Sequence, residues 1–582
     1  MKKIILSLMA GMVLFTSCDL LNNDPYDSFT KEDFFSNEVN VEMYCNYFYN
    51  EWKGYGNNGT YGVFYFPTLN DNQGVPGITP WDFKNVSATD ATWNASYEEV
   101  RRANILLEHI DEADLTDESR AYYTSLGRLY RGWQHFCVVR KFGDCYWVNK
   151  ELTVDDATIL YGKRHDRNLV MDSILADINY AVANMGDMYA ASRTAYNVHV
   201  ANAIKAQVCL FEGTYAKYHL KDTERANKYL TEAKTASEAL IKNEMFALTP
   251  GAEGYRANYN SLDLAGNTEM IMYKQYLESA KLRHATQDYC CGSTPTNGMT
   301  KAAFNSYLMK DGKLPDGNDK GKLFVDIWND TIKSKVDPQK DSVIIINHDT
   351  IMMIDELLAA RDPRLAQQVD ADLRFTGCGR VRYRGLPNQK GASPNTSTTG
   401  YGILKFDEPA TSASLRQSTT GNVTDCPIFW LAEVILNHAE ACAELGEDAA
   451  ATASINLLRA RAGMPNLVLQ ADPANNMGVS DLIWEVRRER RVELMFDNND
   501  RYWSLIRWHQ LDKLDTKVHQ EQTKGAWIDD DCPMGEGLKR DAQGYIDLND
   551  TYVRTFEEKH YLAPIPSGQI SLNPEIGQNP GW

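Results

Sequence analysis

LIWEVRRERRVELMFDNNDRYWSLIRW, residues 482–508, is the stretch of sequence that decides the fold. Ser480 precedes it, and serine is favoured at a helix N-cap because its hydroxyl accepts a hydrogen bond from the first turn. Seven of the nine residues 485–493 are charged, four arginines and three glutamates, and apolar residues flank them on both sides. The pattern predicts a helix whose charges are paired against a neighbouring surface, not a freely solvated face.

This charged run has a structural and a catalytic interpretation. Two pairs of residues lie three positions apart, where helical neighbours can form ion pairs: Glu485 with Arg488, and Arg490 with Glu493. A catalytic role for Glu489 or Glu493 is the alternative, but each has an arginine nearby that neutralises it. We therefore predict a structural clasp, which ends at residues 497–500 (DNND) and is followed by a second short helix containing Arg501.

Helical spacing of apolar residues recurs along much of the chain. Eight segments show it: 93–110, 117–141, 167–191, 197–218, 223–243, 427–446, 451–463 and 480–496. They are similar in length and most are joined by short connections, which is typical of helix–turn–helix pairs that bury their apolar faces on one another. We predict a mostly α-helical fold, an α-solenoid of about four helix pairs.

Other parts of the chain lack this periodicity. Residues 54–90 and 245–426 are rich in glycine, asparagine, threonine and proline, and an irregular segment as long as the second is expected to be functional. Within it, residues 343–347 and 350–354 have the composition of two strands joined by a turn. Prolines within residues 510–582 predict an extended C-terminal tail.

The ERR-x-EL helix and the R-x-x-x-L-x-RW segment after it resemble the C-terminal signature of the SusD/RagB family. Further segments resemble that family in the same order: RRANILLEHID (101–111), GRLYRGWQHFCVVRKFGD (127–144), NTEMIMYKQY (267–276), RDPRL (361–365), AEVILNHAEACAELG (432–446), INLLRARAGMP (455–465) and YLAPIPSGQISLNPEIGQNPGW (561–582). The family often has glycine in the turn where this chain has DNND, but asparagine also tolerates the left-handed conformation.

The resemblance implies a fold, a function and a partner. SusD/RagB proteins are cell-surface glycan-binding lipoproteins of Bacteroidetes-type bacteria, built on tetratricopeptide-type repeats. A single domain over 31–582 is implied, with a helical scaffold at about 91–245 and 427–508 and a ligand-binding portion at about 54–90 and 245–426. The implied partner is a SusC-like TonB-dependent transporter, an outer-membrane barrel over whose outer mouth the protein forms a lid.

The N-terminus predicts a lipoprotein. Residues 1–18 read MKKIILSLMAGMVLFTSC, in which two lysines precede an apolar run too short to span a bilayer. The end of this run, LFTSC, resembles a bacterial lipobox, so we predict a signal peptide at 1–17 and a lipidated Cys18 that three acyl chains anchor to the membrane. A plain secretory signal is the alternative. Residues 18–30 form a polar tether, and the predicted location is the outer membrane, facing the cell exterior.

Composition and motifs limit which ligands and reactions the protein can have. The 582-residue chain has a formal net charge of −19, which argues against nucleic acid because binding it requires a basic surface. Hydrolase, nucleotide-binding and zinc-protease motifs are absent, so we predict no catalytic residue, metal or cofactor. Acidic turns at 316–319 and 529–531 contain oxygen ligands suited to calcium, but neither completes a calcium loop. A cell-surface glycoside hydrolase is the alternative function, because its paired carboxylates need no local motif.

A glycan site needs rigid apolar platforms and a few polar groups. Trp81 is the best predicted platform and Tyr61 and Tyr65 are weaker ones; burial of Trp81 in the core is the alternative. Cys290 and Cys291 are neighbours whose Cα atoms lie about 3.8 Å apart, so a disulfide between them would be strained. If formed, it makes a stiff apolar ring suited to stacking on a sugar. Two unbonded thiols, or bonds to other cysteines, are the alternatives.

Polar residues of the same loops are predicted to recognise sugar hydroxyls. They are Asp71 and Asn72 in the early loop and Arg374 and Tyr401 in the irregular segment. The predicted ligand is a neutral oligosaccharide, because an acidic glycan would meet a protein of like charge. The cysteine pair together with a loop tryptophan resembles the fructan binders of the SusD/RagB family, which implies a levan-type ligand.

Overall fold

The computed structural model describes residues 34–582 except 76, 292–296, 316–324, 327–342, 347–349, 354–357, 370–398, 400, 409, 412–414, 416–417, 419, 529–538, 544 and 549–552. The predicted signal peptide, the lipidation site Cys18 and the tether at 18–30 therefore lie outside the described residues. Arg374 also lies outside them, as do the acidic turns at 316–319 and 529–531.

The fold is mostly α-helical, as the apolar spacing predicts. The scaffold helices are α4 (Ala91–His109), α5 (Asp117–Phe142), α7 (Arg167–Asn184), α8 (Val198–Tyr215), α9 (Thr223–Ile241), α17 (Leu431–Leu445), α18 (Asp448–Ala462) and α19 (Asp481–Glu493). Shorter helices are α3 (Glu38–Cys45), α6 (Ala157–Leu160), α10 (Gly251–Asn260), α11 (Thr286–Cys291), α12 (Lys301–Phe304), α15 (Pro363–Gln368), α20 (Asp500–Arg507) and α21 (Ser567–Leu572).

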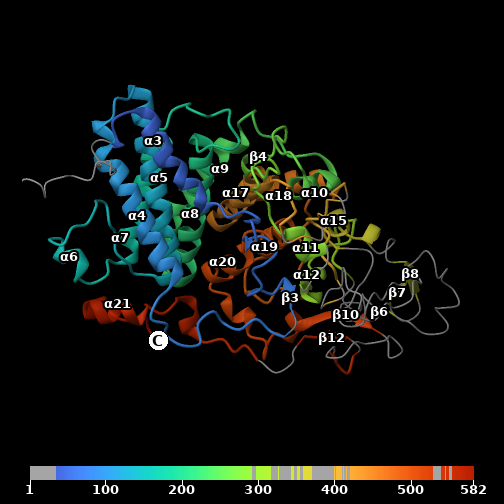
Figure 1. Cartoon of the computed structure of the whole chain (residues 1–582). Helices are drawn as coiled ribbons and strands as arrows, with labels where there is room; N and C mark the ends of the chain where they lie inside the picture. Colours follow the sequence, from blue (N-terminus) through green and yellow to red (C-terminus); the bar gives the residue numbers. More distant parts are fainter. Residues whose placement is uncertain are drawn as a thin grey trace, which may run out of the picture.

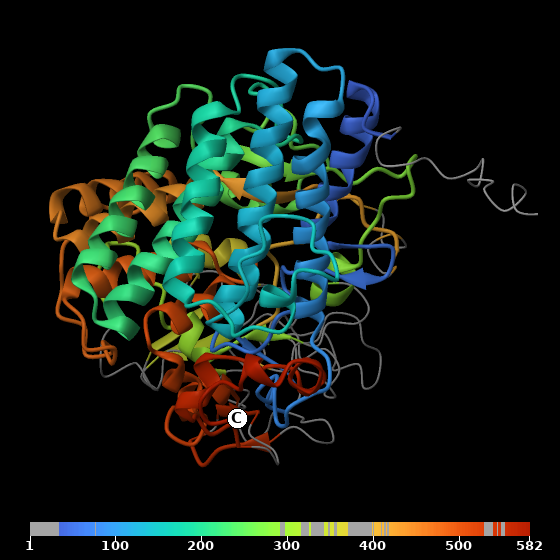
Figure 2. The same cartoon turned by 90° about the vertical axis from the view of Figure 1, so that its left-hand side faces the viewer.

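The scaffold helices stack in chain order (Figures 1 and 2). Helix α4 contacts α5, α5 contacts α7, α7 contacts α8, and α8 contacts α9. The stack continues from α9 directly to α17, although nearly two hundred residues separate them in the sequence, and α17 contacts α18 and α19. The irregular segment is thus an insertion that leaves the solenoid intact, because each helix buries its apolar face on its spatial neighbours.

The ends of the scaffold helices follow from local chemistry. The side chain of Asn197 accepts hydrogen bonds from His199 N and Val200 N at the start of α8. Helices α17 and α18 end at Gly446 and Gly463, whose φ angles of 79° and 75° lie in the left-handed region that glycine adopts without steric cost. These caps explain why most helix ends lie within a few residues of the prediction. The helix predicted at 167–191 is the exception, because α7 ends at Asn184.

The helix predicted at 427–446 is too long at its start. Residues Cys426–Trp430 form strand β9, which pairs antiparallel with β4 (Met270–Lys274), and α17 begins only at Leu431. Every residue of β9 is buried. A continuous run of apolar residues is compatible with a buried strand and with a helix, so the sequence did not distinguish the two here. The β4–β9 pair joins the insertion to the scaffold.

The remaining strands are short, as predicted. Two-residue pairs are β1 (Gly56–Asn57) with β2 (Thr60–Tyr61) and β3 (Gln73–Gly74) with β5 (Gly298–Met299). A six-stranded sheet has the order β11 (Lys539–Arg540), β12 (Tyr545–Asp547), β10 (Lys524–Ile528), β6 (Val325–Asp326), β7 (Val343–Ile346) and β8 (Thr350–Met353). Strands β7 and β8 are antiparallel, which confirms the pair predicted at 343–354.

The C-terminal part is more structured than the predicted extended tail. It contributes β10–β12 to the sheet, contains the short helix α21, and returns under the helical bundle, where both figures show it in red. Ser567 N donates to Ser87 O at 2.9 Å, and Asn579 Nδ2 donates to Phe142 O at 2.9 Å. No helix among the described residues has the length and apolarity needed to cross a bilayer.

Candidate functional site

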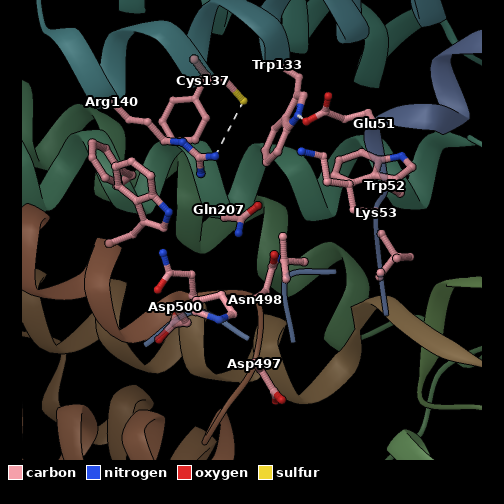
Figure 3. A pocket seen from close by; sticks show the side chains of 18 of the residues that line it. Glu51, Trp52, Lys53, Trp133, Cys137, Arg140, Gln207, Asp497, Asn498 and Asp500 are labelled. Atoms are coloured by element: carbon pink, nitrogen blue, oxygen red, sulfur yellow. Dashed lines mark hydrogen bonds between the residues drawn. The ribbon is translucent and has the colours of Figure 1, made fainter. Parts of the chain in front are cut away.

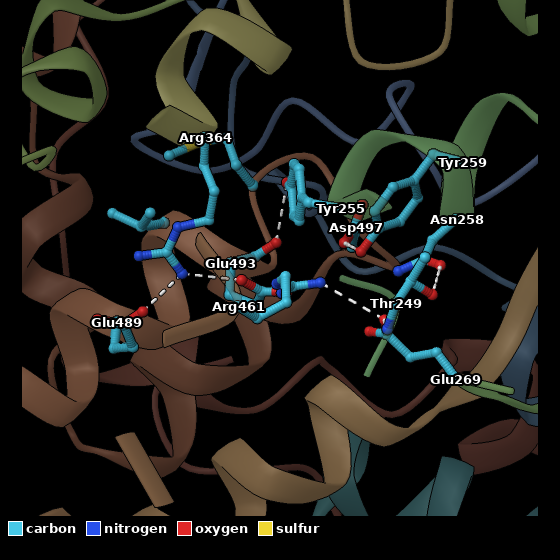
Figure 4. A network of polar contacts seen from close by, with 12 residues as sticks. Thr249, Tyr255, Asn258, Tyr259, Glu269, Arg364, Arg461, Glu489, Glu493 and Asp497 are labelled. Atoms are coloured by element: carbon cyan, nitrogen blue, oxygen red, sulfur yellow. Dashed lines mark hydrogen bonds and ion pairs between the residues drawn. The ribbon is translucent and has the colours of Figure 1, made fainter. Parts of the chain in front are cut away.

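Helix α19 is buried, and its charges pair with partners on other elements (Figure 4). Arg364 of α15 pairs with Glu489 at 2.5 Å and with Glu493 at 2.8 Å. Arg461 of α18 also pairs with Glu493 and lies 3.5 Å from Glu269. Removing one member of such a group would leave its partner charged and buried, so these pairs hold three helices together. This arrangement supports the predicted structural clasp and gives neither glutamate a catalytic surrounding.

The two ion pairs predicted within the helix have different outcomes. Glu485 and Arg488 form the predicted pair at 3.4 Å. The pair of Arg490 with Glu493 is wrong, because Arg490 turns to Glu440 of α17 at 2.9 Å while Glu493 faces α15 and α18. Both glutamates are buried, and Glu493 is already paired with Arg364 and Arg461, so the packing of α19 against its neighbours decides which charges meet.

Asp71 and Asn72, predicted to bind sugar hydroxyls, are instead bound to arginines. Arg501 donates to the two carboxylate oxygens of Asp71 at 2.7 and 2.8 Å, and Arg491 donates to Asn72 Oδ1 at 2.7 Å. Burial alone would raise the pKa of Asp71, but the two arginines outweigh burial and hold that pKa well below its usual value. Both residues are buried and fasten the early loop to the signature segment, so they offer a sugar few free acceptors.

Trp81, the best predicted platform, is 7% exposed. Its Nε1 donates to Thr555 O at 2.7 Å, and its ring stacks on His560 with centroids 4.4 Å apart. The guanidinium of Arg554 lies 5.6 Å from the centre of the same ring. The structure therefore favours the alternative interpretation, in which Trp81 is a packing residue that joins the early loop to the C-terminal part.

Tyr65 and Tyr401 are buried, with exposures of 1% and 0%. The Tyr65 hydroxyl donates to Tyr289 O, and the ring of Tyr401 lies 4.8 Å from that of Phe304. Neither ring presents an open face to a polysaccharide. Tyr65 nevertheless supports the site described next, because it holds the backbone of Tyr289.

Three aromatic rings, those of Tyr61, Phe66 and Tyr289, meet at the surface; we call them the aromatic cluster. Tyr61 stacks on Phe66 with centroids 4.5 Å apart and an interplanar angle of 23°. Tyr289 of α11 meets Tyr61 edge-on at 5.2 Å, and the two phenol oxygens lie 2.7 Å apart. Tyr61 is 54% exposed although two aromatic rings contact it.

The geometry of the cluster suits stacking on a sugar. Its rings come from two segments more than two hundred residues apart, so each ring is fixed by the others rather than by its own loop. The hydrogen bond with Tyr61 and burial together raise the pKa of Tyr289 to about 12, so its hydroxyl stays protonated at neutral pH. A flat exposed ring beside protonated hydroxyls provides both the apolar contact and the hydrogen bonds that a sugar needs.

Only part of this cluster was predicted. Tyr61 was a candidate, and the stretch containing Cys290 and Cys291 was another, but the proximity of the two and the role of Phe66 were not foreseen. Cys290 is buried beside Tyr289. The side chain of Cys291 lies outside the described part, so the vicinal disulfide stays a prediction. An irregular loop rich in aromatic residues is the one sequence signal that pointed here.

Within the described residues, no group of three or more histidine, cysteine, aspartate or glutamate side chains is placed to hold a metal ion. The fold and the cluster define a helical-repeat protein with an exposed stacking surface on its loops. The SusD family profile matches residues 268–582, and a second profile, described as starch-binding and associating with the outer membrane, matches residues 37–210. The chain belongs to the SusD family.

Individual relatives are distant. SusD-like protein P38 of Formosa agariphila is 24% identical over 425 residues, which cover 71% of each chain. A SusD-like carbohydrate-binding protein of Bacteroides fragilis superposes with a TM-score of 0.67 at 18% identity, covering 94% of this chain and all of the other. A laminarin-binding SusD-like protein gives a TM-score of 0.55 at 16% identity, covering 94% of this chain and all of the other. Similarity at this level of identity shows a shared fold.

Proposed function

We propose that the protein is a surface lipoprotein that captures oligo- or polysaccharide, with the aromatic cluster as its glycan-stacking site. The observation that carries this proposal is the exposure of Tyr61, 54%, although the ring is fixed by two aromatic neighbours. Rigid aromatic rings lose little conformational entropy on binding, so they suit an uncharged ligand with repeated sugar rings. Membership of a family that includes carbohydrate-binding relatives supports the same class of ligand.

The finer parts of the proposal come from the family resemblance. The ligand we favour is a fructan such as levan, and the protein would deliver it to a SusC-like TonB-dependent transporter in the outer membrane. Cys18 would carry the lipid anchor, with the body of the protein facing the cell exterior. A consistently monomeric lipoprotein after purification in mild detergent would contradict the transporter partnership.

Calorimetry over a glycan panel of levan, laminarin and starch tests the site. Tyr61→Ala should weaken binding of whichever glycan the wild type binds by at least about tenfold, because stacking on one aromatic ring is lost. Tyr161→Ala is the matched control, since Tyr161 is 61% exposed and lies outside the cluster. Full affinity in Tyr61→Ala would contradict this placement of the site.

A glycoside hydrolase acting on the same class of glycan is the competing function. Incubating the protein with the same glycan panel and analysing the glycans for shortened products tests this alternative. Turnover of any bound glycan would overturn the proposal of a non-enzymatic capture protein.

A further inference from the structure

A cavity of about 540 Å³ lies between the helical bundle and the turn that follows α19 (Figure 3). Helices α5, α8 and α17 line it together with residues 50–54 and 497–500. Small-molecule pockets measure roughly 300–1,000 Å³, so the volume suits a ligand. Asn50 and Lys53 are exposed members of the lining, so the cavity opens to solvent beside them. No ring of the aromatic cluster lines it.

Indole rings form much of the apolar wall. Trp52 and Trp133 lie with ring centroids 5.2 Å apart, and both are more than nine-tenths buried. Trp503, from α20, lines the cavity as well, with the guanidinium of Arg140 lying 4.4 Å from its ring centre. These side chains make one wall of the cavity apolar, which suits contact with the C–H groups of a sugar ring.

Polar atoms without a protein partner also line the cavity. Among the described residues, Gln207 Oε1 and Asn499 Oδ1 are buried and accept no hydrogen bond. Figure 3 shows the Gln207 amide and the Arg140 guanidinium directed toward the same open space. Buried polar groups in native proteins almost always have a partner, so these atoms point to water or a polar ligand in the cavity.

Glu433 of α17 adds a carboxyl group to the lining. Its Oε1 accepts from Gln207 Nε2 at a long 3.4 Å. Burial and then the charge of Asp500 raise the pKa of Glu433 to about 8, so its carboxyl group keeps a proton at neutral pH. In that form it donates a hydrogen bond, as well as accepting one.

Several charged side chains of the lining are paired, but among the described residues Arg140, Lys53 and Glu51 form no ion pair; Glu51 accepts instead from Trp133 and Gln134. Arg490 is paired with Asp500 at 2.9 Å, and Lys405 neutralises Asp497 at 2.7 Å. Among the described residues, Arg140 has only the sulfur of Cys137, 3.8 Å away, as a hydrogen-bond acceptor. Nowhere in the described ranges does a carboxylate lie within 4 Å of the Arg140 guanidinium, and its Nε is buried without a partner.

We propose that this cavity binds a sugar unit that carries a carboxylate, of the uronic acid class. The carboxylate would pair with Arg140, the ring would lie against the indoles, and hydroxyls would bond to Gln207 and Glu433. Charge-assisted bonds between arginine and carboxylate are the strong ones in such sites. The net charge of −19 does not prevent this, because distant charges are screened over about 8 Å at physiological salt.

Calorimetry on the full chain with D-glucuronate and D-galacturonate as probes, and D-glucose as the neutral comparison, tests the proposal. At least one uronate should bind, and glucose should bind at least about tenfold more weakly, the effect of one charge-assisted hydrogen bond. Failure of both uronates to bind at millimolar concentration would overturn the proposal. Equal affinity for glucose would overturn it too, because Arg140 would then have no role in recognition.

Variants locate the binding within the cavity. Arg140→Gln should weaken uronate binding at least about tenfold, and Gln207→Leu provides a second variant that keeps the arginine. Arg128→Gln is the matched control, since Arg128 lies on the same helix with its guanidinium 3.9 Å from the ring centre of Tyr180 and outside the cavity lining. Unchanged affinity in both cavity variants would contradict the placement.

The two binding proposals fail separately. Tyr61→Ala should leave uronate binding intact, because Tyr61 does not line the cavity. Loss of uronate binding in Tyr61→Ala, with the melting temperature unchanged, would assign the uronate to the aromatic cluster and overturn the cavity proposal alone.

Discussion

Arg501 binds both carboxylate oxygens of Asp71, at 2.7 and 2.8 Å, across 430 positions of sequence. The carboxylate belongs to an early loop and the guanidinium to α20, next to the signature helix. Together with the bonds from Arg491 to Asp71 and Asn72, this bidentate pair holds the loop that follows the aromatic-rich residues 61–66. Asp71 was predicted to bind the ligand, but its carboxylate is used in this structural pair.

Asp71→Asn should therefore destabilise the protein. Removing one partner of a buried pair leaves the other charge uncompensated, which costs about 3–5 kcal/mol. Urea unfolding at pH 7 measures the loss. Arg101→Gln is the control, because the Arg101 side chain is 64% exposed in its pair with Glu151 and such a pair is worth about 1 kcal/mol or less. Equal effects of the two substitutions would show that the Asp71 pair is not structural.

Glu440 should make stability depend on acid pH. Burial opposes its ionisation, but Arg507 and Arg490 outweigh burial and lower its pKa to about 2. A lowered folded-state pKa means that the stability it contributes is present above about pH 4.5 and is lost as the pH falls through about 2, on the order of 3 kcal/mol.

Glu440→Gln should accordingly unfold at lower urea than the wild type at pH 7, and the gap should narrow at pH 2–3. Chemical unfolding at a series of pH values measures both. A gap that stays constant with pH would show that ionised Glu440 is not the stabilising form.

Glu433 should make the protein less stable as the pH rises, the opposite of the dependence expected from Glu440. Its folded-state pKa of about 8 lies above the ordinary 4.5, so the folded state binds the proton more tightly than the unfolded chain. Stability linked to this group is fully present below about pH 4.5 and falls as the pH rises towards 8. Glu433→Gln should thus add more to the free energy of unfolding at pH 8 than at pH 5, by up to about 3 kcal/mol. The gain in melting temperature should therefore be larger at pH 8.

Asp172→Asn gives a matched carboxylate-to-amide comparison for that measurement, because its pKa is lowered by hydrogen bonds from Lys228 and Tyr229 that outweigh burial. It should lower the melting temperature at pH 8. A gain for Glu433→Gln that does not depend on pH would contradict the buried proton.

Trp81→Ala separates packing from binding. Loss of a largely buried indole should cost about 3–5 kcal/mol, since a cavity is left between the early loop and the C-terminal part. Below its melting temperature the variant should bind glycan as the wild type does. A variant that melts normally and fails to bind would restore Trp81 as the sugar platform.

Cys18→Ala tests the predicted anchor. The substitution removes the thiol that would carry the lipid, so the protein should be released from membranes or remain unprocessed. Metabolic labelling with an acyl-chain precursor, followed by membrane fractionation, measures this. Acyl labelling equal to that of the wild type would place the lipid elsewhere.

The sequence by itself determined what depends on neighbours along the chain. Apolar spacing and capping residues such as Asn197 and Gly446 place the helices, because helical contacts join residues three or four apart. The Glu485–Arg488 pair was predictable for the same reason. The segments that resemble the SusD/RagB family, in the family's order, then indicated the overall fold.

Tertiary structure alone decided what depends on distant segments. Arg490 pairs with Glu440 and not with Glu493. Residues 427–430 form a strand because β4 pairs with them. Tyr61 contacts Tyr289, 228 positions away in the sequence. Burial removes competing water and strengthens whichever partners the chain brings together. Those partners are set by how the whole molecule packs, so no local pattern identifies them.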